Sequence, residues 1–283
     1  MPFTKPNLLY VPSAYKAGKT YSILPEDGSG DFTFTRPTEA ERTNGDKLLQ
    51  TMGNDVPRID YSNPGCPSLL LEPQRTNVAL DSSDISSSEF VLLGVTESNS
   101  ILTNTSANTQ HRFFQTRTVT AGAQTGYVFL KNISTTYVQL TTGSIGGVND
   151  HANFDLENLT KVFENTPNNS TFGIDKVGDN IRIWNSWNSA GGAANFQLCF
   201  VDNPNAGRLP TYSGNISEYC KIVCYQLEEG SYPTSYIPTQ GSTVTRVNEE
   251  ANLTNMFSKG LINSTQGSVY LELNAEEVER DGS

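Results

Sequence analysis

RFFQTRTVTAGAQTGYVFLK, the sequence from Arg112 to Lys131, contains two segments rich in β-branched and aromatic residues, the kind that strands favour. Residues 112–119 and 125–131 are each short enough for a strand and show no helical period. The Ala-Gly pair at 121–122 lies between them and predicts a turn. We therefore expect two short strands separated by a turn in this stretch.

The same pattern extends over most of the chain, from about Val78 to Pro238. Further turns are expected at 143–147, 167–169, 191–192 and 204–207, where Gly, Pro and Asn gather. Many short strands at such spacing predict an all-β fold, a jelly-roll β-sandwich. The eight expected strands are Phe90–Thr96, Arg112–Val119, Thr125–Lys131, Thr136–Thr142, Ala152–Asp155, Ile181–Trp187, Asn195–Val201 and Glu218–Glu228.

Three parts are expected along the chain. Residues 1–62 predict an extended N-terminal arm, because their short apolar patches are interrupted by Pro and Gly and cannot close a core. This arm either is buried between subunits or packs along its own sandwich. Residues 63–240 form the jelly-roll domain. Residues 241–283 are a polar linker followed by the start of a further module, or by a strand (Ser268–Asn274) that completes another sheet.

Composition excludes several classes of protein. Only 17% of residues are charged, against about 25% in an ordinary soluble domain, and neutral polar residues take their place. The net charge is -11 without any cluster of Lys and Arg, so we expect no nucleic-acid partner. No apolar run reaches the ~18–20 residues of a bilayer span, and no secretion leader is visible. We therefore expect no membrane insertion.

The four cysteines and two histidines do not predict a metal site. Cys220 and Cys224 would lie about 13 Å apart on one face of a strand, too far for a disulfide. His111 and His151 are in unrelated segments, which argues against zinc. Buried free thiols are the expected state, and they suit assembly in a reducing cytoplasm.

Three blocks of sequence resemble bacteriophage virion proteins of the tail-fibre, head-fibre and appendage type. The first is GDFTFTR (30–36) with VPRIDY (56–61), and the second is CPSLLLEPQRTN (66–77). The third is YQLEEGSYPTSYIPT (225–239) with TVTRV (243–247). In such proteins the second and third blocks bracket a jelly-roll domain similar to a carbohydrate-binding module. A lectin-like sandwich often follows, and GSVYLE at 267–272 resembles its first strand.

This resemblance implies a structural virion protein, assembled in the host cytoplasm, that forms a homo-oligomer, a trimer, with other virion proteins as partners. Host attachment through a cell-surface glycan is the implied role of the jelly-roll domain. The alternative is the accessory sugar-binding part of a larger phage depolymerase. A bacterial surface adhesin is a third class, and it would require a secretion signal.

Sugar-binding residues are expected where aromatic rings lie among amide and guanidinium groups. The sequence RIWNSWN (182–188) is the richest such mixture, and alternation places Arg182 and Trp184 on the face opposite Ile183. Trp187 falls beyond the alternation, which leaves both a loop and the core open to it. The glycan-binding candidates are Arg182, Trp184, Trp187 and, in a long polar loop, Tyr212. The alternatives are that the tryptophans fill the core and that the Tyr212 loop is a plain connection.

Catalysis and cofactors are not expected. The 30 acidic residues contain no pair singled out by its setting, and Glu228 and Glu229 would point to opposite faces of a strand. No nucleophile, phosphate-loop or paired-histidine motif is present. We therefore expect a protein that is not an enzyme and needs no cofactor. The weak metal candidate is a structural calcium held by oxygens of Asp150, Asn153 and Asp155.

Overall fold

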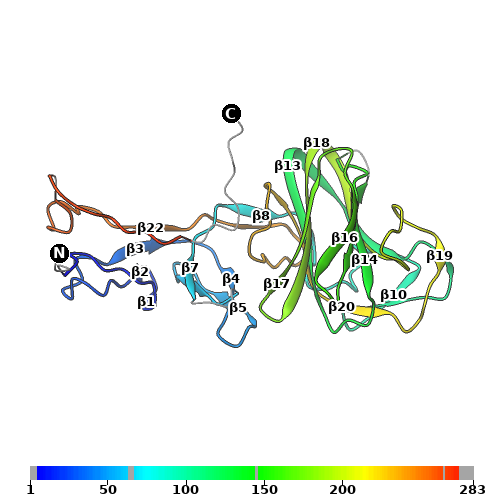
Figure 1. Cartoon of the computed structure of the whole chain (residues 1–283), viewed down its shortest axis with the longest axis horizontal. Helices are drawn as coiled ribbons and strands as arrows, with labels where there is room; N and C mark the ends of the chain where they lie inside the picture. The colour runs from blue at the N-terminus through cyan, green and yellow to red at the C-terminus, as the bar shows by residue number, and fades with distance from the viewer. Residues whose placement is uncertain (1–4, 63–66, 144–145, 264, 274–283) are drawn as a thin grey trace.

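The structure is a computed structural model that describes residues 5–62, 67–143, 146–263 and 265–273. These residues form strands, turns and loops and no helix, which confirms the all-β expectation. The described residues accordingly include no helix with the length and apolarity needed to cross a bilayer. Figure 1 shows an elongated molecule with a large sheet at one end and the N-terminal arm at the other.

The arm consists of short antiparallel ladders. β22 returns from the C-terminal part of the chain to complete a four-stranded sheet in the order β1-β2-β3-β22. Further pairs join β4 to β5 and β6 to β7. The arm strands are β1 (Tyr15–Lys16), β2 (Lys19–Thr20), β3 (Phe32–Thr35), β4 (Ala40–Thr43), β5 (Leu49–Met52), β6 (Arg58–Asp60), β7 (Ser68–Leu70) and β22 (Glu250–Asn252).

The large sheet has ten antiparallel strands. They are β9 (Val91–Leu93), β10 (Val95–Ser98), β11 (Ile101–Asn104), β13 (Arg112–Lys131), β14 (Tyr137–Gly143), β15 (His151–Asp155), β16 (Thr160–Asn165), β17 (Thr171–Val177), β18 (Asn180–Phe200) and β20 (Tyr219–Glu229). Two small ladders lie outside this sheet, β12 (Asn108–Thr109) with β19 (Tyr212–Ser213), and β8 (Arg75–Asn77) with β21 (Val244–Arg246).

The turns expected at 121–122 and 191–192 are wrong. Both glycine-containing pairs lie inside long strands, because β13 and β18 pair with each other along nearly their whole length, from Arg112↔Cys199 to Leu130↔Ile181. Gly122, Gly191 and Gly192 have φ values of 119°, 85° and 104°. Only glycine adopts such angles at low cost, so these residues allow the paired strands to bend without ending the ladder.

The bend divides the sheet into two halves. In the β14 half, the first part of β13 and the last part of β18 pair with β9 and with β14 to β16. In the β20 half, the remaining parts of β13 and β18 pair with β20, β11, β10 and β17. Two expected strands thus merge into each long strand, and the strand expected at 90–96 divides into β9 and β10 at Gly94.

One core lies between the two halves. The hydroxyl of Tyr225, on β20, donates a 2.7 Å hydrogen bond to the carbonyl oxygen of Phe196, on the β14 half. The Tyr225 ring also lies 5.7 Å, centroid to centroid, from that of Phe113 on the β14 half. Apolar side chains from both halves therefore share one core.

The segment expected to be a polar linker is instead part of the arm. Within 241–252, β21 pairs with β8 and β22 pairs with β3, so this segment runs back along the arm (Figure 1). The expected strand Ser268–Asn274 is not formed in its described part, residues 268–273. The three described cysteines, Cys199, Cys220 and Cys224, are buried free thiols as expected, and Cys66 lies outside the described residues.

Gly126→Ala tests the contact between the two halves. A Cβ atom at this buried position of the β20 half would lie 2.7 Å from the ring of Phe196 on the β14 half. We expect the added methyl group to lower the free energy of unfolding by about 1–3 kcal/mol, as overpacking does. Urea denaturation measures this change. Gly207→Ala is the control, because nothing lies within 4 Å of its Cβ position, and equal effects would contradict a tight contact between Gly126 and Phe196.

Candidate functional site

Five charged side chains are brought together where the arm meets the large sheet. We call Arg36, Arg58, Glu72, Arg246 and Glu249 the junction cluster. The side chains of the three arginines and of Glu249 are 0% exposed, and that of Glu72 is 12% exposed. Charges removed from water are costly unless they are paired and hydrogen-bonded, so their partners determine whether this region can fold.

Arg58, at the start of β6, is the centre of the cluster. Its Nε donates to Glu249 Oε1 at 2.7 Å, and its Nη2 donates to Glu72 Oε2 at 2.8 Å and also to Glu249 Oε2. Its Nη1 donates to the carbonyl oxygen of Glu41 at 2.7 Å. The guanidinium fork is therefore used in full, in the two-pronged geometry that suits a carboxylate.

Arg36 and Arg246 complete the cluster from two other segments. Arg36 Nη1 donates to Glu249 Oε1 at 2.7 Å, and its Nη2 donates to the carbonyl oxygen of Gly53 at 2.7 Å. Arg246 Nη1 lies 3.0 Å from Glu72 Oε2 and donates to Ser235 Oγ at 2.8 Å. Residues separated by up to 213 positions along the chain are thus held by one network.

The network keeps its groups charged. Burial by itself would raise the pKa of Glu72, but the charges of Arg246 and Arg58 and a hydrogen bond from Ser235 lower it to about 2. Burial opposes the charge on Arg58, yet Glu72 and Glu249 raise its pKa. Next to the cluster, burial raises the pKa of Glu228 to about 6, although Thr234 donates two hydrogen bonds to its carboxylate.

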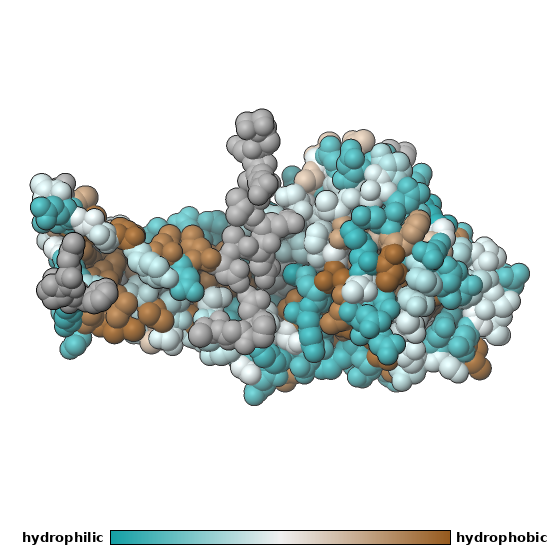
Figure 2. Space-filling model, viewed as in Figure 1, coloured by the Kyte–Doolittle hydropathy of each residue, from teal (hydrophilic) through white to brown (hydrophobic). Residues whose placement is uncertain are grey.

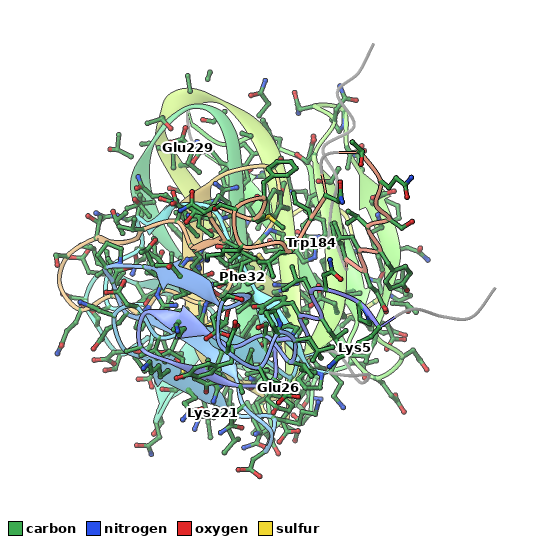
Figure 3. All side chains as sticks on the ribbon, turned by 90° about the vertical axis from the view of Figure 1, so that its left-hand side faces the viewer. Lys5, Glu26, Phe32, Trp184, Lys221 and Glu229 are labelled. Carbon is green, nitrogen blue, oxygen red and sulfur yellow. The ribbon has the colours of Figure 1, made fainter. Side chains whose placement is uncertain are left out.

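A shallow pocket with a volume of about 50 Å³ opens beside the cluster, between the arm and the β20 half. We call it the junction pocket. Its lining includes Glu41 and Asp60 from the arm, Arg182 and Phe129 from the sheet, and Tyr236. Figure 3 views the molecule from the arm end, with Trp184 labelled. The pocket combines apolar and charged walls.

Of the four glycan-binding candidates, Arg182 and Trp184 lie together at this junction. They share the face of β18 that alternation predicts. Arg182 pairs with Asp175 (Nη2 to Oδ2, 2.9 Å), and its guanidinium group lies 6.0 Å from the ring centre of Tyr127. Trp184 is half-buried and packs on the small apolar cluster that contains Tyr127. A Cβ atom at Gly173 would lie 2.3 Å from Trp184 Cε2, so only glycine leaves room for the indole there.

Trp187 and Tyr212 lie elsewhere. Trp187 fills the core, which was the alternative to a loop position, because β18 continues to Phe200 and directs this side chain inward. Trp187 is 3% exposed, and its Nε1 donates to the carbonyl oxygen of Gly146 at 2.9 Å. Tyr212 lies on β19, at the end of the molecule farthest from the arm (Figure 1), with its ring 4.5 Å from that of His111. The structure therefore brings two of the four candidates together.

The three calcium candidates do not converge on one point. Asp150 accepts hydrogen bonds from the backbone amides of Asn168 and Ser170, both at 3.0 Å. The side chain of Asn153 bonds to Gln139 and to two loop carbonyls, and Asp155 caps its own turn. These oxygens serve local structure. Across the described part of the chain, no group of three or more His, Cys, Asp or Glu side chains has the arrangement of a metal site.

Glu249→Gln tests whether the junction cluster holds the returning C-terminal segment on the arm. Removing this charge leaves Arg36 without a buried counter-charge and Arg58 with Glu72 alone, so we expect the free energy of unfolding to fall by about 3–5 kcal/mol. Hydrogen exchange of the β21 and β22 amides should accelerate. Glu250→Gln is the control, because Glu250 is exposed, and we expect a change within about 0.5 kcal/mol. A similar small change in Glu249→Gln would contradict this role.

Comparisons with known proteins add no family. The chain was compared with protein-family models and with curated protein sequences, and neither comparison found a match.

Proposed function

We propose that this chain is a structural subunit of a bacteriophage particle, a fibre or appendage, in which the arm mounts the large sheet for outward display. On this proposal the bent sheet is a jelly-roll β-sandwich similar to a carbohydrate-binding module, and it binds a host surface glycan. The protein forms a homo-oligomer, a trimer, and its other partners are virion proteins. It acts in the virion and not as an enzyme.

The observation that carries this proposal is where the three resembling blocks meet. Arg36 and Arg58 belong to the first block, Glu72 to the second, and Ser235 and Arg246 to the third. All five lie in the one hydrogen-bonded network at the junction. Blocks this far apart in sequence therefore have a shared physical task, which is to join the arm to the displayed sheet at a fixed angle.

The elongated shape supports the structural role. Figure 2 shows hydrophobic surface along the arm, where a soluble monomer would gain by covering it. The exposed apolar residues of the arm include Val11 (47%), Ile23 (48%) and Leu48 (50%). Burial of such residues between identical subunits is the simplest way to remove them from water.

Light scattering on the full chain tests the oligomer. We expect a mass about three times the 30.9 kDa of one chain at micromolar concentration. Val11→Asp should weaken the assembly, because it places a charge in the buried contact. Ile216→Asp is the control: Ile216 is 68% exposed, but it lies in the loop before β20. A monomeric mass for the unmodified protein would contradict the proposal.

A glycan array tests the sugar-binding part. The half-buried indole of Trp184, beside Arg182 and the junction pocket, supplies the ring face and the hydrogen-bond donors that a sugar requires. Trp184→Ala should weaken binding at least tenfold, since a lost stacking contact is worth about 1.4 kcal/mol or more. Tyr219→Ala, at a partly exposed aromatic residue near the start of β20, should bind normally. Absence of binding at millimolar sugar, or equal effects of both variants, would contradict this part.

A further inference from the structure

Two arginines on the outer face of the β14 half have no carboxylate partner among the described residues. They are Arg112, at the start of β13, and Arg208, in the loop that follows β18. The chain has 30 acidic residues and 19 basic ones, and the other two arginines of the large sheet, Arg117 and Arg182, pair with Glu89 and Asp175. Leaving two half-buried guanidinium groups without a counter-charge is costly.

Arg208 is fixed in place by the sheet. Its Nε donates to Thr141 Oγ1 at 2.9 Å, and its Nη2 donates to the carbonyl oxygen of Thr142 at 2.6 Å. Burial lowers the pKa of Arg208, and the nearby charge of Arg112 lowers it further. The two cations are therefore close enough to repel each other, and the bonds to β14 prevent Arg208 from moving away.

Gln197 joins the two arginines. Its Oε1 accepts a hydrogen bond from Arg112 Nη1, which directs its Nε2 toward β14. A Cβ atom at Gly143 would lie 3.0 Å from Gln197 Nε2 and 3.3 Å from Arg208 Nη2. No described residue accepts a hydrogen bond from Gln197 Nε2. The amide and guanidinium donors are thus neighbours above a glycine that carries no side chain.

Two further side chains complete the surroundings. Phe114 lies beneath Arg112, with the guanidinium carbon 5.0 Å from its ring centre. His151, the cross-strand partner of Thr141, is 3% exposed, and neither of its ring nitrogens has a hydrogen-bond partner among the described residues. Arg112 Nε is likewise buried without a partner. The region therefore holds several buried polar groups without a hydrogen-bond partner among the described residues.

We propose that Arg112, Gln197 and Arg208 bind the carboxylate of an acidic sugar residue of the uronic-acid type. Arginine forks match a carboxylate in geometry and charge, and the Gln197 amide supplies a third donor to it. The Thr116 and Asn195 side chains, bonded to each other at 2.8 Å on the same face, are polar groups suited to sugar hydroxyls. This site rests on the proposed display of the domain to a glycan, but it lies on the β14 half, away from Trp184.

Titration with glucuronate and glucose tests the site, because these sugars differ by the carboxylate. The readout is the arginine Nε–H signals of the ¹⁵N-labelled full chain. We expect glucuronate to shift the signals of Arg112 and Arg208 with saturation in the millimolar range, and glucose to leave them unchanged. Arg208→Gln should weaken glucuronate binding at least tenfold, because a hydrogen bond to a charged group is lost. Arg208→Lys keeps the charge, so its affinity for glucuronate should lie between those of the unmodified protein and Arg208→Gln. It replaces Arg208→Gln in the test if that variant does not fold.

Arg42→Gln is the matched control, since Arg42 lies in the arm and bonds to Gln50 and Tyr15. Inorganic phosphate is a third titrant: binding as tight as that of glucuronate would overturn the assignment to a sugar carboxylate. Equal responses to glucose and glucuronate, or none to either, would overturn the site. Trp184→Ala should leave glucuronate binding intact, so failure here is separable from failure at the junction.

Discussion

The burial of three guanidinium groups at one point is the constraint on which the rest of the structure depends. A charge removed from water is tolerated only beside its partners, and here the partners of Arg58 are Glu72, 14 positions along the chain, and Glu249, 191 positions along it. The arm, the large sheet and the returning segment must therefore pack together, because none of them can bury its charged side chains without the others. A swing of the arm would leave at least one of these charges unpaired, so the cluster resists a hinge at this place.

The same stiffness continues into the large sheet. Asn77, at the end of β8, donates to the carbonyl oxygen of Ile237 at 2.9 Å and accepts from the amide of Leu227 on β20 at 3.1 Å. These bonds fix β8 relative to β20. β20 in turn pairs with β13, and β13 continues into the β14 half because it bends at Gly122 without ending. Hydrogen bonds therefore connect the junction cluster to the β14 half without a break.

The sequence predicted the strands and their faces better than it predicted their ends. Alternation with a period of two placed Arg182 and Trp184 opposite Ile183 correctly, because that period depends only on the extended backbone. It failed at Gly122, because a glycine that bends a long strand has the same local pattern as one that ends it. Local pattern also could not identify the junction cluster, since each of its charges stands alone in its segment. The sole signal was that these charges lie within the blocks that resemble one family.

Two sets of arginines in this acidic chain differ in how their charge is met. The arginines at the junction are neutralised by Glu72 and Glu249, and these ion pairs hold the arm and the sheet together. Arg112 and Arg208 are held by neutral acceptors alone, on the half of the sheet whose β14 lies farther from the arm than β17 does (Figure 1). A rigid junction makes this difference useful, because it fixes the direction in which the unneutralised pair faces. The counter-charge that the protein does not provide there must come from solvent ions or from a ligand, and a ligand carboxylate gains by replacing the mobile ions.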